Sequence, residues 1–246
     1  MRIMKKIGII GGFNLDTTLN YYERINRLAS DHLGGMGTPD MILRSVNSGD
    51  YCRLMKNNDW HHVGQLLATE VFQLLFDDCC DHVAVASCSM HRFATHIERS
   101  LGSIGMDENP PFVHIGDCIA NECKVMGARS VLLLGKKSTM TEGFISGRLS
   151  THGIETIDTS NFNKEIDEID RIISEELCRG RATMKSWNFL LDFIHQFSIE
   201  DGSRPDAVVL GSTELGLMLR QDDVDIPLID AMEVHIRQLA KLSSVA

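Results

Sequence analysis

The sequence has no long apolar run and no cluster of basic residues. No window approaches the roughly 18 apolar residues that a membrane-spanning helix needs. The 34 acidic residues outnumber the 24 lysines and arginines, which gives a net charge of −10 and a pI near 5.4. Because binding to nucleic-acid phosphates requires a basic face, this balance argues against a nucleic-acid partner. We therefore expect neither a membrane nor a nucleic acid as partner, but a small molecule.

Signals for export and for zinc binding are also missing. The basic N-terminal stretch is followed by too short an apolar segment to form the core of a signal peptide. The seven cysteines are an odd number, so without an export signal we expect reduced thiols and a cytoplasmic location. Cys79 and Cys80 are adjacent, and Cys118 and Cys123 are five residues apart, so neither pair has the Cys-x2-Cys spacing of a zinc site. No metal is expected.

The glycines near the N-terminus do not form a dinucleotide-binding motif. Gly8, Gly11 and Gly12 lack the Gly-x-Gly-x-x-Gly spacing, which argues against a nicotinamide cofactor. The chain of 246 residues is 43% hydrophobic and 24% charged, values typical of a globular protein. Its length is sufficient for two lobes of roughly 110 residues each.

Two pairs of apolar runs recur along the chain at nearly one period. Residues 83–86 lead into Ser87, and residues 208–210 lead through Gly211 into Ser212, which lies 125 residues later. A second pair, 7–11 and 131–135, is offset by 124 residues. Continuous runs of Val, Ile and Leu ending in Gly or Ser are typical of parallel strands buried on both faces. The sequence therefore predicts an α/β protein with two similar, doubly wound lobes, each with a parallel sheet, related by an internal duplication.

The polar residues that follow these strands are the candidate site. Open α/β sheets bind ligands at the carboxyl ends of their strands. Free N–H groups at the start of the helix that follows favour an anion, such as a substrate carboxylate. If an approximate two-fold relates the lobes, the segments 87–89 and 212–214 face each other across a cleft.

The remaining elements follow from apolar periodicity and turn signals. We expect Asp16 or Thr17 to cap a helix that continues through Asn26. Further strands are expected at 5–12, 41–46, 112–115, 155–157 and 227–230. Further helices are expected at 60–76, 92–99, 117–126, 163–178, 185–197 and 232–242.

Several stretches stand out along nearly the whole chain: 7–12 with Thr17 and Thr18, the tyrosines with Ile25 and Asn26 of 21–26, 89–91, 134–135 with 139–140 and 147–149, 175–180, and 210–214. Taken together and in this order, they resemble the aspartate/glutamate racemase superfamily. The resemblance implies two α/β lobes with the active site between them, at 1–115 and 116–228, with the C-terminal helix 229–246 packing back on the first. It also implies a homodimer.

The resemblance further implies racemisation of aspartate or glutamate without pyridoxal phosphate or any other cofactor. In such a reaction one thiol removes the α-proton on one side of the amino acid, and a second thiol delivers a proton on the other side. Inversion through a carbanion needs an acid and a base on opposite sides. Thiols serve both roles because their pKa, about 8.5 when unperturbed, is easily lowered at a helix N-terminus.

The sequence departs from the family at both expected thiols. The usual first motif is Cys-Asn-Thr-x-His, and matching it on His91 puts Ser87 in place of the thiol and Cys88 in place of the asparagine. The usual second motif, Gly-Cys-Thr-Glu, here has Ser212 in place of its cysteine. A serine hydroxyl is a much weaker acid than a thiol, and no His–Asp pair adjoins either serine in sequence. A symmetric two-thiol mechanism is therefore excluded.

Three alternatives remain. In the first, Cys88 supplies one base and Ser212 or Ser87 relays a proton, with His91 or Glu214 assisting, as in a slow or one-sided racemase. In the second, the site performs other carbanion or elimination chemistry on a dicarboxylate, as a related isomerase or lyase with a single cysteine. In the third, the lobes bind an amino acid or dicarboxylate without turning it over, and Cys88 is a small buried residue beneath the loop.

The substrate contacts come partly from the resemblance and partly from position. Lys137 is our first choice for the cation that binds a distal carboxylate, and Arg44 is the second. His91 is expected to orient its loop, to cap its helix or to act in catalysis. Asn47 ends a strand at the carboxyl edge of the sheet and is expected to face the cleft. Hydroxyls that match polar positions in the family's carboxylate-binding loops are Thr18, Ser89, Thr139 and Thr213.

Overall fold

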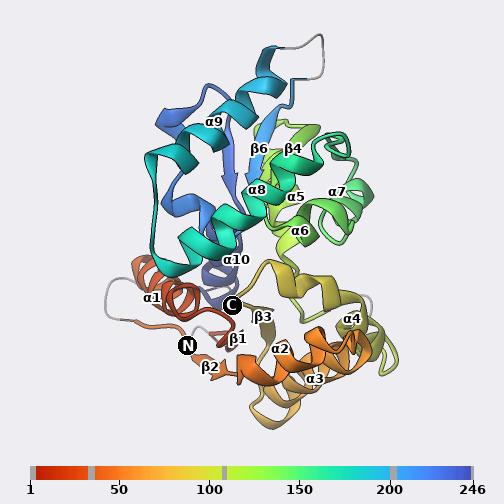
Figure 1. Cartoon of the computed structure of the whole chain (residues 1–246). Coiled ribbons are helices and arrows are strands. Elements are labelled where there is room, and N and C mark those ends of the chain that lie inside the picture. The colour runs from red at the N-terminus through yellow and green to blue at the C-terminus, as the bar shows by residue number, and fades with distance from the viewer. Residues whose placement is uncertain (1–3, 33–36, 107–109, 200–203, 245–246) are drawn as a thin grey trace. The chain divides into compact units, whose positions relative to one another are not determined.

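The structure is a computed structural model, and it describes residues 4–32, 37–106, 110–199 and 204–244. The chain divides into two compact units, Met1–His114 with Ile236–Ala246, and Ile115–His235. Each unit contains a parallel β-sheet flanked by helices (Figure 1). The last helix, α10 (Ala231–Ser244), begins in the second unit and ends in the first. No helix in these ranges combines the length and apolar character needed to cross a membrane.

The first unit has a three-stranded sheet in the order β2-β1-β3, with every pair parallel. Its strands are β1 (Ile7–Gly11), β2 (Met41–Ser45) and β3 (His82–Val85). Its helices are α1 (Leu15–His32), α2 (Ser48–Lys56), α3 (Trp60–Phe72) and α4 (Ala94–Gly102), with a π-helical segment at Gln73–Asp77 and a 3-10 helix at Ser89–Phe93. Because β1 is central and buried throughout, it is apolar or glycine at every position.

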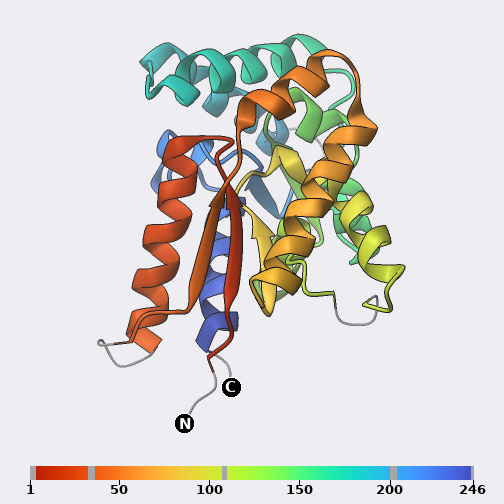
Figure 2. The ribbon, with the colours of Figure 1, turned by 90° about the horizontal axis from the view of Figure 1, so that it is seen from below.

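Both faces of this sheet are covered, as continuous apolar strands require. Alternate side chains of a strand point to opposite faces. Ile10, Val83 and Val85 pack into one cluster with Leu67 and Ile97, from α3 and α4. Helix α1 lies on the other side of the strands (Figure 2).

The second unit has a four-stranded parallel sheet in the order β5-β4-β6-β7. Its strands are β4 (Ser130–Leu134), β5 (Glu155–Thr156), β6 (Ala207–Leu210) and β7 (Leu228–Asp230). Helices α8 (Asn163–Arg171) and α9 (Met184–Ile199) lie on one side of it and pack against Leu132, Leu134, Val208 and Leu210 (Figure 1). The helices are α5 (Ile115–Met126), α6 (Lys137–Thr141), α7 (Ser146–Thr151), α8 (Asn163–Arg171) and α9 (Met184–Ile199), with a π-helical segment at Ile172–Glu176 and 3-10 helices at Leu177–Arg179, Leu215–Leu217 and Gln221–Asp223.

The two sheets share one strand order, which agrees with the predicted duplication. The first strand of each unit, β1 or β4, is flanked by the second strand, β2 or β5, and by the third, β3 or β6. The fourth position differs. Strand β7 pairs with β6, whereas its counterpart in the first unit is a single parallel bridge between Val83 and Phe112. The predicted strand at 112–115 is therefore wrong, because two prolines without N–H groups precede it and α5 begins at Ile115.

The helices differ from the predictions in three places. The cap of α1 is Asn14, whose Oδ1 accepts a hydrogen bond from Thr17 N at 3.0 Å, and not Asp16 or Thr17 itself. Helix α2 was not predicted, and it follows immediately after Asn47. The long helix expected at 163–178 ends as α-helix at Arg171, continues as π and 3-10 turns, and stops at Gly180, whose φ of 67° is left-handed.

Candidate functional site

The loop after β3 gathers two hydroxyls and a thiol. Ala86 N donates to Ile10 O at 2.9 Å, and the chain then leaves the sheet into the 3-10 helix that begins at Ser89. The hydroxyl oxygens of Ser87 and Ser89 lie 3.3 Å apart. Between them, the side chain of Cys88 is buried. The loop therefore offers two partly exposed hydroxyls above one buried thiol.

His91 supports this loop from beneath. It is 1% exposed, and its Nδ1 lies 2.9 Å from the carbonyl oxygen of Ser87. Because a carbonyl oxygen can only accept, Nδ1 carries the proton in this hydrogen bond. The ring also meets His114 edge to face, with centroids 4.9 Å apart, and lies 5.7 Å from the ring of Phe112. This geometry corresponds to the loop-orienting role among those expected for His91.

The loop after β6 is built around one buried carboxylate. Gly211 N donates to Leu134 O at 2.6 Å, so this loop starts beside the end of β4, the first strand of its sheet. Ser212 Oγ donates to Glu214 Oε2 at 2.5 Å, and Thr213 Oγ1 donates to the same oxygen at 3.0 Å. Ser212 and Glu214 are 4% and 8% exposed. The hydroxyl that replaces the expected thiol is therefore joined directly to an acid.

A thiol from elsewhere in the chain binds the other oxygen of this carboxylate. Cys178, in the 3-10 turn after α8, donates from Sγ to Glu214 Oε1 at 3.4 Å. The stretch 175–180 is part of the family resemblance, but no role was predicted for Cys178 itself. The sequence contains no signal for the contact, because 36 residues separate the thiol from the carboxylate.

The electrostatics of this cluster keep the acid ionised and the thiol protonated. Burial works against ionisation of Glu214, but the hydrogen bond from Ser212, the charge of Lys136 and the bond from Thr213 together lower its pKa below the usual range. Burial, followed by the charge of Glu214, raises the pKa of the Cys178 thiol to about 11. At neutral pH the pair is thus a carboxylate and a thiol.

In each unit, a threonine side chain packs against a glycine in the loop that joins the first strand to the helix after it. A Cβ added to Gly11 would lie 2.4 Å from Thr18 Cγ2, and one added to Gly135 would lie 3.0 Å from Thr139 Cγ2. The Thr18 hydroxyl accepts from Gly12 N at 3.0 Å and donates to a loop carbonyl at 2.7 Å, which gives it a structural role. The Thr139 hydroxyl is buried and has no hydrogen-bond partner in the described part of the chain.

The three remaining substrate-binding candidates are engaged with neighbouring side chains. Asn47 is exposed and caps α2, because its Oδ1 accepts from Gly49 N at 3.1 Å. Lys137 is exposed, and its Nζ contacts Asp167 Oδ1 at 2.6 Å, a hydrogen bond that raises the pKa of the lysine. Arg44 has two acidic partners, at 2.6 and 3.2 Å. Both predicted cations are therefore already paired with acids.

Lys136, the neighbour of the predicted Lys137, is the cation that acts on the Glu214 cluster. Its charge contributes to the lowered pKa of Glu214, and it partly opposes the rise in the pKa of Cys178. It is half-buried and directly precedes α6. The sequence predicted Lys137, with Arg44 second, and gave Lys136 no role, because nothing local indicates which side chain lies near the carboxylate.

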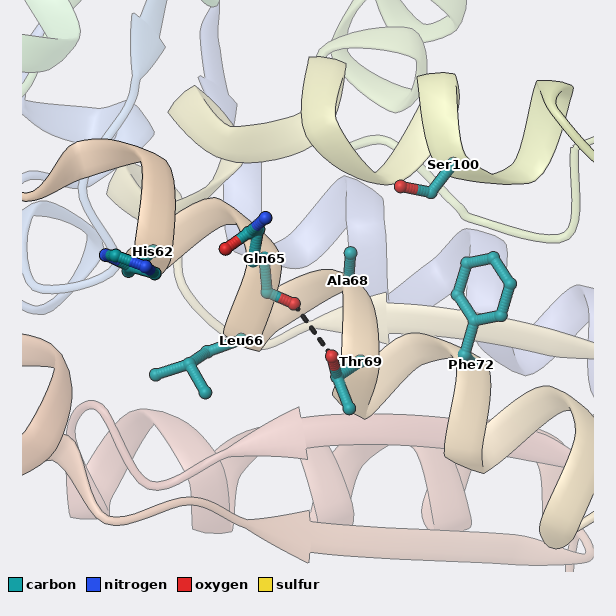
Figure 3. A pocket seen from close by; sticks show the side chains of 7 residues that line it. All are labelled: His62, Gln65, Leu66, Ala68, Thr69, Phe72 and Ser100. Atoms are coloured by element: carbon teal, nitrogen blue, oxygen red, sulfur yellow. Dashed lines mark hydrogen bonds between the residues drawn. The ribbon is translucent and has the colours of Figure 1, made fainter.

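A surface hollow on the first unit lies apart from all these residues. It is lined by side chains of α3 and by Ser100 of α4 (Figure 3). The hydrogen bond drawn there joins Thr69 Oγ1 to the backbone oxygen of Gln65 within α3. The lining offers no convergent set of charged groups, and no predicted site residue contributes to it. In the described ranges, no group of three His, Cys, Asp or Glu side chains is placed to hold a metal ion.

Comparison with known proteins identifies the class to which this fold and these loops belong. The family model for Asp/Glu/hydantoin racemases matches residues 10–239. The chain therefore belongs to the Asp/Glu/hydantoin racemase family, and the resemblance inferred from the sequence is confirmed.

Solved structures agree over nearly the whole length. A candidate Asp/Glu racemase from Yersinia pestis is 30% identical, with 98% of this chain and 99% of that chain covered and a TM-score of 0.86. An aspartate racemase homologue from Pyrococcus horikoshii OT3 is 31% identical, with 98% and 100% covered and a TM-score of 0.79. Aspartate racemase from Picrophilus torridus, at 19% identity, 97% and 94% coverage and a TM-score of 0.67, shares the fold.

Proposed function

We propose that this protein is a cofactor-independent racemase or epimerase, acting on aspartate or glutamate, with unlike acid–base groups in its two units. The observation that supports this most directly is the 2.5 Å hydrogen bond from Ser212 to the ionised Glu214. It gives the second unit a base at the position where family members carry a thiol. In the first unit the proposed acid–base group is the thiol of Cys88, one residue after the expected thiol position.

In this arrangement every proton that leaves one group is accepted by another, and Ser212 is never left as an alkoxide. On the side of the second unit, the α-proton moves to Ser212 Oγ as the serine proton moves to Glu214 Oε2. The electrons of the C–H bond remain on the substrate and delocalise into its carboxylate. On the other side, the Cys88 thiol gives its proton to Cα and keeps the S–H electron pair as a thiolate. The reverse reaction starts from this thiolate and the protonated Glu214.

The proposal is tested by exchange at Cα. L- and D-aspartate and glutamate are followed by NMR in deuterated buffer, which detects one-sided proton removal as well as inversion. Deuterium incorporation with loss of chirality supports a racemase. We expect Ser212→Ala and Glu214→Gln to slow exchange to a similar extent, since they interrupt one relay. Cys88→Ala should abolish inversion, and unchanged turnover in that variant would contradict the role of Cys88.

The two alternatives give different outcomes in the same experiment. Loss of the substrate indicates other carbanion or elimination chemistry on a dicarboxylate, whereas exchange without inversion indicates a one-sided racemase. Absence of exchange in a sample that binds these ligands by calorimetry indicates a binding protein. The homodimer implied by the resemblance is part of the proposal, and analytical ultracentrifugation of the full chain tests it.

A further inference from the structure

We propose that Cys178 is a positioning residue for the acid–base reaction, one that holds Glu214 Oε1 so that Oε2 remains directed to Ser212. This inference rests on the proposed function, because it assigns a partner to the Ser212–Glu214 pair. The two oxygens of the carboxylate have different donors: Cys178 Sγ on Oε1 at 3.4 Å, and the hydroxyls of Ser212 and Thr213 on Oε2. The thiol thus prevents rotation of the carboxylate away from the serine.

The backbone that carries Cys178 is fixed on both sides. Leu177 is buried in the core of the second unit, and the left-handed Gly180 ends the turn. Just before the turn, Glu176 accepts from Ser186 Oγ at 2.6 Å and from Arg171 Nη2 at 2.8 Å. These anchors follow a π-helical segment, and such segments are frequent at functional sites.

The charges around the thiol support the same role. Burial contributes most to the raised pKa of Cys178, the carboxylate of Glu214 adds to it, that of Asp170 adds less, and Lys136 opposes it. The thiol therefore stays protonated at neutral pH and serves as a donor. A thiolate at this position would repel the carboxylate that it now orients.

The first measurement is the pH profile of α-proton exchange for the wild type and three variants. Cys178→Ala removes a donor to the carboxylate, so the acid limb should move about half to one pH unit higher, with the plateau retained. Cys178→Ser keeps a donor and should restore the limb. Cys123→Ala removes another buried thiol of the same unit and should leave the profile unchanged. A lowered plateau with an unmoved limb in Cys178→Ala would indicate only structural damage and overturn the inference.

The second measurement does not require turnover. Iodoacetamide labelling of each cysteine is followed by mass spectrometry at pH 8 in the wild type and in Glu214→Gln, with the exposed Cys52 as internal reference. Removal of the charge should lower the pKa of Cys178 and increase its labelling rate about three-fold or more. An unchanged rate would overturn the inference even if exchange is observed. Faster labelling without exchange in the wild type would retain the thiol–carboxylate contact but refute both the proposed function and the positioning role.

Discussion

Replacement of Glu214 by glutamine should destabilise the second unit at neutral pH, although the side chains have the same shape. Glu214 is 8% exposed and accepts hydrogen bonds from Ser212 at 2.5 Å, from Thr213 at 3.0 Å and from Cys178 at 3.4 Å. A hydrogen bond to a charged group contributes about 1.5–3 kcal/mol. Glutamine removes the charge and directs an N–H group at one of the donors. We expect a loss of about 2–3 kcal/mol in the free energy of unfolding.

The pH dependence separates this effect from ordinary side-chain packing. The pKa of Glu214 is lower in the folded protein than in the unfolded chain, so the ionised carboxylate stabilises the fold above the unfolded pKa of about 4.3. This contribution is lost as the pH falls through the folded pKa. The difference between wild type and Glu214→Gln should therefore be full at pH 7 and should shrink as the pH falls below the unfolded pKa and through the lower folded pKa.

The assay can follow the second unit alone, because each unit has one tryptophan. Trp60 lies in the first unit, and Trp187 packs against the core of the second. In a Trp60→Phe background, urea unfolding followed by fluorescence reports on the surroundings of Trp187. With a urea slope of about 2 kcal/mol per molar, the midpoint for Glu214→Gln should fall by about 1 M at pH 7. An equal midpoint for both proteins at pH 7, or a difference that does not shrink as the pH is lowered through the acid range in which the protein stays folded, would refute the reasoning.

Three further predictions concern single contacts. Gly11→Ala should lower the free energy of unfolding by about 1–3 kcal/mol, because the added Cβ would lie 2.4 Å from a threonine side chain. Gly147→Ala is the control: its Cβ would meet no atom within 4 Å, so the free energy of unfolding should not fall. Urea denaturation measures both variants. Asn14→Ala should cost about 1 kcal/mol in the same assay, because it removes the N-cap of α1, and an unchanged midpoint would contradict this role. Cys118, whose pKa burial raises to about 12, should resist alkylation at pH 8 while the exposed Cys52 reacts; equal labelling would refute this.

The strands and their duplication could be predicted because their signal is local. A run such as 208–210 is apolar at every position, and a strand buried on both faces requires that pattern. The bridge at Phe112 shows the limit of this argument. The segment is apolar, but its pairing depends on the prolines before it and on the helix that begins at Ile115. Apolar character predicts burial, and the backbone decides whether a strand forms.

Only those parts of the site whose residues are adjacent in sequence could be predicted. Residues 212–214 are adjacent in sequence, and their hydroxyls and carboxylate do bind one another. Cys178 reaches Glu214 only because an irregular helix end brings it to the carboxyl edge of β6, and nothing local indicates that contact. Lys137 was the predicted cation, with Arg44 second, and Lys136 was given no role. Helix α6 begins at Lys137, and the charge of Lys136, just before it, is the one that acts on Glu214.

Because the two loops carry different bases, the two enantiomers should differ in how their α-proton exchange depends on pH. Glu214 is ionised at neutral and mildly acidic pH, so the base of the second unit is ready across that range. The first unit depends on a thiolate, whose population falls tenfold for each pH unit below the pKa of the thiol. The enantiomer deprotonated through Ser212 should therefore keep exchanging its α-proton at pH 6, while exchange of its mirror image declines. Parallel pH profiles for the two enantiomers at low conversion would show that one kind of base serves both, and would exclude the asymmetric relay.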